Sequence, residues 1–431
     1  MLACAHASAP SPERALATWR DIQATANSSL RSLERTTPIG SGRALDAEQA
    51  YALALAHNPE LAVTEAEVDV AEADIAAARQ LDNPTLRLTG LRLDDIRQDR
   101  PEVNLGLRAP LPRPGSLRAK IDSARFRAGE AQGAAEAARV QLRATIFRLF
   151  ARLAWLTADL AEVERAAEIA DARRRQLGQR VERALATGVD LALAAAAQSE
   201  AQDEVARLRD ELARTRDELA RIVAPGTSPH FRIDPRDLDV GPLDLDEAAL
   251  TELALRRRPE LRAAQSRVGE AEAAVRLART EALPWIRWAQ VSYHAGPESS
   301  PRALGFGVAL DLPVLSWNRG EIRSARAVAR QRRLEERAQV ASVVGEVEAA
   351  LARARRADAR VREIEQNLLP RLELAAQEAD AALAAGALDV LKVLDIEARR
   401  VAARRLHLAA RFERRDALLE LEAATGGPLP R

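Results

Sequence analysis

Hydrophobic and polar residues alternate in two regions of the sequence, and this is the period of β-strands. The first region lies near residues 84–112 and the second near residues 284–315. We therefore expect four strands, at about 84–94, 102–112, 284–294 and 303–315. Each strand has one apolar and one polar face, and the expected apolar residues are Leu86, Leu88, Leu91, Leu93, Val103, Leu105, Leu107, Ala109, Ile286, Trp288, Val291, Tyr293, Leu304, Phe306, Val308 and Leu310. A phase slip at Gly90 and at the equivalent residue 290 predicts a β-bulge in each hairpin.

Long alanine- and charge-rich segments without strand alternation follow each predicted hairpin. They predict helices over about 116–186 and 319–384, each on the order of 100 Å long. Pro370 is expected to bend the second one. Gly188 and Gly386 are expected to end these helices in a left-handed conformation, and Asp190 and Asp389 to cap the returning helices that reach about 224 and 424.

The two halves of the chain repeat each other. "HNPELAVTEAEVDVAEADIAAAR" at 57–79 matches "RRPELRAAQSRVGEAEAAVRLAR" at 257–279, at an offset of 200. After one inserted residue the match continues at an offset of 201, so that Ile121 and Arg125 correspond to Ile322 and Arg326. Prolines and glycines shared at a fixed distance indicate a true duplication. Asn58 is a good N-cap for a helix starting at Pro59, whereas its counterpart Arg258 is a poorer one.

The repeat divides the chain into five segments. Residues 1–44 are expected to be an export, lipidation and tether segment, and residues 45–223 the first repeat. An equatorial linker over 224–244 leads to the second repeat at 245–427, and residues 428–431 form a tail. Cys4, the only cysteine, follows Leu2-Ala3 as in the end of a lipoprotein box, which predicts its lipidation. The alternative is an ordinary disordered N-terminus.

Composition excludes several classes of function. The 431 residues are 47% hydrophobic but only 3% aromatic, and 64 basic residues balance 64 acidic ones, so nothing in the charge favours nucleic acid. The five histidines are scattered without ligand spacing, and no phosphate loop or nucleophile elbow occurs. We therefore expect no enzyme activity, no metal site and no cofactor.

The strand pattern favours a membrane-embedded sheet. Segments near ten residues with one apolar face are typical of membrane β-strands, although a half-buried hairpin on a soluble core is the alternative. Trp285, Trp288, Tyr293 and Trp317 cluster in the second hairpin, and we interpret them as interface aromatics. Four strands cannot close a cylinder, so sister chains must complete it, and three copies would supply twelve strands.

The duplicated "NPEL"/"RPEL" helix, the hairpins, "PLPRPGSLRAKIDSAR" and "SWNRGEIRSAR", and the long helices resemble the outer-membrane factor (TolC-like) family. The resemblance implies a mostly α-helical homotrimer whose 12-stranded β-barrel, in contact with outer-membrane lipid, continues as an α-helical barrel in the periplasm of a Gram-negative bacterium. It also implies a periplasmic adaptor and an inner-membrane resistance–nodulation–division (RND) pump as partners. The short arginine- and proline-bearing end of the first hairpin is similar to the heavy-metal branch, which implies metal cations as cargo.

The resemblance assigns the two helical turns to a periplasmic gate that the adaptor contacts. The residues are Thr187, Gly188, Val189, Asp190, Gly386, Ala387, Leu388 and Asp389. In a trimer, inward-facing carboxylates at Asp190 and Asp389 would form rings that bind cations; the alternative is that they only cap helices. Two other functions stay open: the outer-membrane channel of a type I secretion system, and a soluble periplasmic helical scaffold.

Overall fold

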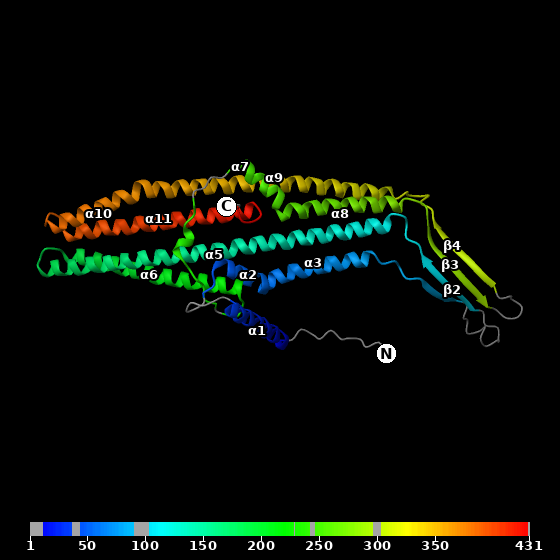
Figure 1. Ribbon diagram of the computed structural model, residues 1–431, viewed down its shortest axis with the longest axis horizontal. Coiled ribbons are helices and arrows are strands. Elements are labelled where there is room, and N and C mark those ends of the chain that lie inside the picture. Colours follow the sequence, from blue (N-terminus) through cyan, green and yellow to red (C-terminus); the bar gives the residue numbers. More distant parts are fainter. Residues whose placement is uncertain are drawn as a thin grey trace. The chain divides into compact units, whose positions relative to one another are not determined.

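The computed structural model describes residues 12–36, 44–89, 103–227, 229–241, 246–295 and 303–429, and it is mostly helical. The chain forms two compact units (Figure 1). The sheet unit comprises Val63–Ala137 and Arg258–Ser342, and the helical unit comprises Met1–Ala62, Ala138–Arg257 and Val343–Arg431. Cys4 and the expected bulge at Gly90 lie outside the described residues. No described helix is long and apolar enough to cross a membrane.

The sheet unit carries four antiparallel strands in the order β1 (Thr85–Thr89), β2 (Val103–Pro110), β3 (Trp285–Ala295) and β4 (Ala303–Asp311). The pairs Leu88↔Leu105, Leu105↔Tyr293 and Tyr293↔Leu304 fix the register. Because side chains alternate between faces, the register places all apolar positions of β1, β2 and β4 on one face. Phe306 is the most exposed large side chain of that face, at 83%.

The bulge in the second hairpin lies elsewhere than predicted. β2 pairs with β3 without interruption from Ala295 to Trp288, and the register shifts between Ile286 and Trp288. The extra residue is Arg287, whose carbonyl accepts a hydrogen bond from the Leu111 N–H at 2.9 Å. The prediction that Trp288 shares the apolar face with Ile286 is therefore wrong. Trp288 lies on the polar face, with the Arg108 guanidinium 3.8 Å from its ring centroid.

Four helices lie side by side next to the sheet, and all or part of each belongs to the sheet unit. Their order is α3 (Pro59–Ala78), α5 (Ser116–Glu182), α8 (Pro259–Glu281) and α9 (Arg319–Glu363), as Figure 1 shows. The side chain of Gln132 in α5 donates to Glu72 in α3 at 3.1 Å. Arg333 in α9 pairs with Glu272 in α8 at 2.6 Å. Asn58 caps α3 by accepting hydrogen bonds from the backbone N–H groups of its first turn, as predicted, whereas Arg258 makes no side-chain cap bond to α8.

Small residues bring α5 and α8 together. A Cβ atom added at Gly133 would lie 3.0 Å from the Cβ of Ala263, and one added at Gly269 would lie 2.4 Å from the Phe126 ring. Substituting either glycine would force the helices apart. Alanines and glycines at this contact thus allow close helix packing with little side-chain volume.

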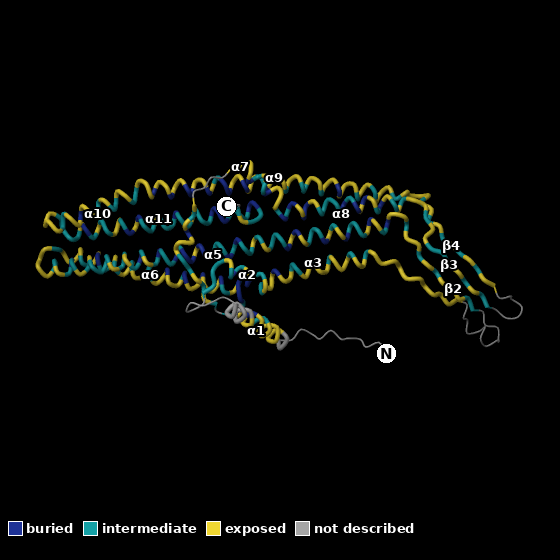
Figure 2. The backbone as a smooth tube through the Cα atoms, in the orientation of Figure 1, coloured by how far each residue is buried: buried dark blue, intermediate teal, exposed yellow. Residues whose placement is uncertain are grey.

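The helical unit contains α1 (Pro12–Thr36), α2 (Ala47–His57), α6 (Gly188–Val223), α7 (Glu247–Arg257), α10 (Leu369–Ala384), α11 (Val390–Ala424) and the remainder of α5 and α9. Buried positions are marked along these helices in Figure 2. The principal core is built by Leu153, Leu156, Leu208, Leu219 and Val223 with their neighbours. The expected tether instead includes a helix, α1, in which Ala26 is buried and Gln23 Nε2 donates to the Gly226 carbonyl at 3.2 Å.

The linker between the repeats is fixed to the helical unit by backbone pairing and by a buried side chain. Leu45 and Phe231 form a parallel bridge, and Leu238 at the end of a 3-10 turn (Pro235–Leu238) is fully buried. Near Pro370, where a bend was expected, the second long helix is irregular. Because proline cannot donate a backbone hydrogen bond, the helix between α9 and α10 widens into a π-helical turn, Ile364–Leu368, immediately before it.

Asp159 is one of two described aspartates of the helical unit that are buried and paired with arginine, the other being Asp358. Asp159 in α5 is 3% exposed and accepts two hydrogen bonds from Arg405 in α11, at 2.7 and 2.9 Å. Arg405 also donates to Glu204 in α6 at 3.2 Å. This arginine therefore joins three helices, and the burial of Asp159 makes the pairing obligatory.

We predict that Arg405→Leu lowers the free energy of unfolding by about 2–4 kcal/mol, because it leaves the Asp159 carboxylate buried without its partner. Urea denaturation followed by circular dichroism measures this loss. Arg399→Leu is the control, since the exposed Arg399–Asp395 pair should contribute less than about 0.5 kcal/mol. Equal losses in the two variants would contradict the prediction.

Candidate functional site

The turn between α5 and α6 is built differently from the sequence prediction. The helix α5 ends at Glu182, and Ala184 takes the left-handed conformation with φ 58°. Thr187 is the N-cap of α6, and Asp190 completes a capping box by accepting from the Thr187 N–H at 2.9 Å. The predictions that Gly188 ends α5 and that Asp190 is the N-cap are therefore wrong. A threonine three residues before an acidic residue satisfies two helix-end donors at once, and Gly188 becomes the first helical residue.

The turn between α10 and α11 agrees with the sequence prediction. Gly386 has φ 69°, and its N–H donates to the Leu383 carbonyl at 3.0 Å. Asp389 is the N-cap of α11 and accepts from the Leu391 N–H at 3.4 Å. Glycine is favoured here because the left-handed conformation costs it little.

An ion pair joins the two turns. Arg180, in the last turn of α5, donates from Nη2 to Oδ1 of Asp389. This hydrogen bond from Arg180 is the main reason that the pKa of Asp389 lies below its ordinary value. The side-chain hydrogen bond from Thr187 likewise lowers the pKa of Asp190. The two carboxylates singled out from the sequence therefore differ: Asp190 is engaged within its own turn, while Asp389 links two helical hairpins.

The first turn is the more apolar one at its surface. Leu185, Val189 and Leu193 are all exposed around it. In the second turn Ala387 is exposed and Leu388 half-buried. Exposed aliphatic side chains next to a capped turn offer a contact surface to another protein.

The register separates the aromatic residues that the sequence grouped together. Tyr293 lies on the apolar face of the sheet, whereas Trp285 and Trp288 lie on the polar face. Trp285 donates from its ring nitrogen to the Leu111 carbonyl at 3.0 Å. Trp317 is exposed beyond β4 and takes a left-handed conformation with φ 47°. Trp288 and Tyr293 lie on opposite faces because β3 alternates without interruption between them, and the bulge at Arg287, which the hydrophobic pattern did not reveal, places Trp285 on the polar face as well.

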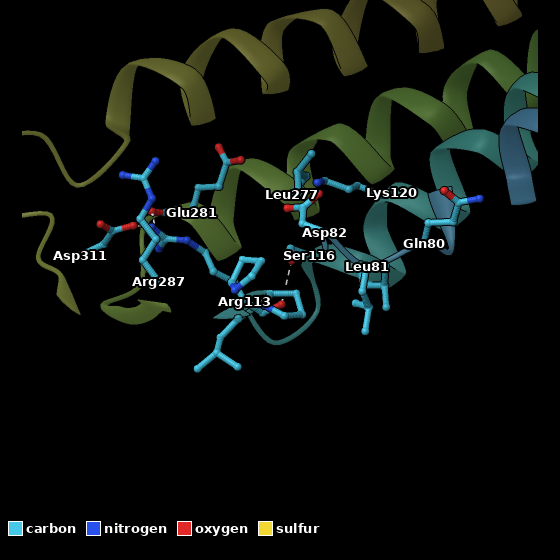
Figure 3. Close-up of a pocket in the computed structure, with 14 residues that line it drawn as sticks. Gln80, Leu81, Asp82, Arg113, Ser116, Lys120, Leu277, Glu281, Arg287 and Asp311 are labelled. Carbon is cyan, nitrogen blue, oxygen red and sulfur yellow. Dashed lines mark hydrogen bonds and ion pairs between the residues drawn. The ribbon is translucent and has the colours of Figure 1, made fainter. Parts of the chain in front are cut away.

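An arginine that sequence reasoning did not single out holds the end of the sheet to the helices. Arg113 donates to Asp311 at 2.9 Å and to the carbonyl of Glu281 at 3.1 Å. It borders a hollow of about 430 Å³ that also includes Lys120 and Arg287 (Figure 3). Its position in "PLPRPG" indicated only a turn. Arg180 was missed as well, because its partner Asp389 is 209 residues away in sequence.

A comparison with known protein families gives a match over most of the chain. A sequence model of the family described as outer membrane efflux protein matches residues 50–224 and 250–427. The chain belongs to this family. The two matched segments lie within the two sequence repeats and the linker that joins them, and membership places the protein in the outer membrane and in efflux. Outer membrane efflux proteins are channel proteins rather than enzymes.

Solved outer-membrane channels have the same fold. The channel OprN superposes with a TM-score of 0.72 at 22% identity, covering 89% of this chain and 90% of its own. CusC superposes with a TM-score of 0.72 at 19% identity, covering 91% of this chain and 96% of its own. The open state of MtrE from Neisseria gonorrhoeae superposes with a TM-score of 0.69 at 19% identity, covering 91% of this chain and 94% of its own. No curated protein matches the chain significantly in sequence.

We predict that Asp389→Asn speeds amide hydrogen exchange over residues 390–393, because removing the negative charge weakens both the bond to Arg180 and the favourable interaction with the N-terminus of α11. A carboxylate with a depressed pKa contributes fully above the ordinary aspartate pKa of about 3.9, and its contribution is lost as the pH falls through the lower pKa of the folded protein. The ratio of exchange rates between variant and wild type should therefore be largest at neutral pH and approach one in acid.

Asp190→Asn is the control for this experiment. Its effect should be confined to residues 188–191, since its capping box is local. If Asp389→Asn leaves exchange over 390–393 unchanged at neutral pH, the capping and pairing of Asp389 do not hold this turn.

Proposed function

We propose that three copies of the chain form the exit duct of a tripartite efflux system. Their sheets close a 12-stranded β-barrel in the outer membrane, and their helices continue it as a periplasmic α-helical barrel. A periplasmic adaptor and an inner-membrane RND pump deliver the cargo. One observation carries this proposal: the four-stranded sheet has an exposed apolar face, and no other described strand pairs with either of its edges.

The edges of the sheet require sister chains. Within the described residues, β1 and β4 each pair on one side only. An unpaired backbone group in lipid costs several kcal/mol, so an open four-stranded sheet is unstable there. Twelve strands from three copies satisfy every edge and direct the apolar face to lipid. The opposite face, with Arg87, Arg108 and Gln290, then borders water.

The two helical turns support the assignment of a gate. Thr187–Asp190 and Gly386–Asp389 are proposed to form the periplasmic end, where each protomer contributes two hairpins. The Arg180–Asp389 pair holds one hairpin against the other, so breaking it favours dilation. The adaptor is proposed to contact Leu185, Val189 and Leu193, because these aliphatic side chains are exposed next to the turn.

The cargo is proposed from the resemblance to the heavy-metal branch, which implies metal cations. The described residues contain no group of three or more His, Cys, Asp or Glu side chains placed to hold a metal ion. We therefore assign cargo selection to the pump rather than to the duct. Lipidation of Cys4 stays a prediction, and mass spectrometry of the membrane-extracted protein tests it.

We predict that Arg180→Met increases the open probability of single channels in planar lipid bilayers, because it removes the bond between the hairpins but keeps the Asp389 cap. Arg399→Met, on the exposed face of α11, is the matched control and should conduct like the wild type. An open probability of Arg180→Met equal to that of the wild type would contradict the role of this pair in the gate. Absence of any channel activity in the wild type would contradict the proposed function.

A further inference from the structure

The two outer helices of the sheet unit each leave one apolar flank uncovered. In the order α3–α5–α8–α9, the helices α3 and α9 have a neighbour on one side only. The largest exposed aliphatic side chains of α3 are Val63 and Val70, at 60% and 64%. Those of α9 within the sheet unit include Val328 and Leu334, at 43% and 56%. Such flanks are covered in a stable assembly.

The internal duplication provides a template for what covers them. Residues of α5 correspond to residues of α9 at an offset of 201, and residues of α3 correspond to residues of α8 at an offset of 200. The contact between α5 and α8 inside one chain is therefore equivalent to a contact between α9 and the α3 of another chain. Within one chain, α9 and α3 lie at opposite edges and cannot make it.

The template pairs the exposed aliphatic side chains with one another. Gly133 and Ala263, whose Cβ positions lie 3.0 Å apart, correspond to Leu334 and Val63. Arg127 and Glu270 form an ion pair at 3.1 Å inside the chain. Their counterparts in the other repeat are Val328 and Val70, respectively. All four uncovered residues thus meet an apolar partner in register, although none was used to choose the alignment.

The charges of the two edges are complementary as well. The helix α3 has six acidic residues and no basic residue. On α9, one exposed face carries four arginines spaced i, i+4, i+7 and i+11, and none of them forms an ion pair with another described residue: Arg319, Arg323, Arg326 and Arg330. Such a concentration of unpaired positive charge favours an acidic partner.

The template also places a specific acid against this arginine face. Gly269, which packs on Phe126, corresponds to Asp69, and Phe126 corresponds to Ala327. On the surface of α9, Ala327 lies between Arg323 and Arg330, four residues after one and three before the other. At this position α9 has the small Ala327 where α5 has Phe126, and α3 has Asp69 where α8 has Gly269.

We propose that α3 of a second copy docks on α9, with Val63 and Val70 against Leu334 and Val328 and with Asp69 between Arg323 and Arg330. This seam rests on the proposed trimer and specifies its register. Because α3 leads into β1 and α9 follows β4, the same two edges meet in the helices and in the sheet. The contact is head-to-tail, so it closes a ring when the rotation between copies permits.

A disulfide tests the register directly. In a Cys4→Ala background we would combine Val63→Cys with Leu334→Cys and oxidise the detergent-purified protein. The template separation of 3.0 Å widens slightly for larger side chains, which brings the two Cβ atoms into the range of about 3.5–4.5 Å that a disulfide requires. We expect dimers and trimers on non-reducing gels that revert to monomer with reductant.

The control pairs Val63→Cys with Val340→Cys, which the template does not bring together, and it should stay monomeric on the gel. The mass of the unoxidised protein in detergent is measured in parallel. A trimer that gives no cross-linked ladder contradicts the proposed seam but not the duct. A protein that is monomeric in detergent contradicts the trimer itself, and with it both proposals.

Charge reversal tests the electrostatic part of the seam. Asp69→Arg should reduce the trimer fraction about tenfold, because it places like charges together. Adding Arg323→Asp and Arg330→Asp to it should restore the trimer. If these arginine substitutions leave the trimer intact but remove a co-purifying anionic lipid, the arginine face binds lipid headgroups and this part of the proposal is wrong.

Discussion

The backbone hydrogen bonds at the edges of the sheet are the constraint on which the rest of the structure depends. A strand in water can leave one edge to solvent, but a strand in lipid has no such alternative. The sheet of this protein has its aliphatic side chains on one face, and among the described strands β1 and β4 each have a single partner. In lipid, a sheet of this kind is stable only when its edges find partners. The proposed closure by sister chains would also constrain how the helices that follow the strands pack.

The helices satisfy that requirement through small side chains and arginine–carboxylate pairs. Glycines in α5 and α8 allow backbones to approach, as at Gly133 and Gly269. Ion pairs such as Arg276–Asp122, at 3.2 Å, then fix the register between neighbouring helices. Because of the internal duplication, the helix at one edge of the unit is equivalent in sequence to a helix inside it. The proposed contact between chains therefore takes the contact inside one chain as its template.

Much of the architecture could be predicted from the sequence, because it depends on local patterns. The alternation of strands, the caps at Asn58 and Asp389, the left-handed Gly386 and the irregular helix near Pro370 all depend on residues close together in sequence. The bulge at Arg287 could not be read in this way, since it depends on how β3 pairs with two other strands.

The two helical turns were harder to predict for two further reasons. At Thr187 a capping box competes with a glycine terminator, and both patterns occur within four residues, so spacing alone did not decide between them. The partner of Asp389 is Arg180, 209 residues away, and no periodicity connects the two. Sequence reasoning identified the correct turns but assigned the wrong roles to Gly188 and Asp190.

The most direct test of the central claim is amide hydrogen exchange at the two sheet edges in the protein reconstituted in lipid or mild detergent. If sister chains complete the sheet, the outward-facing amides of β1 and β4 are as protected as those of the central strands β2 and β3. Exchange at β1 and β4 as fast as in the exposed turns would contradict the account, because it would mean that the edges remain open.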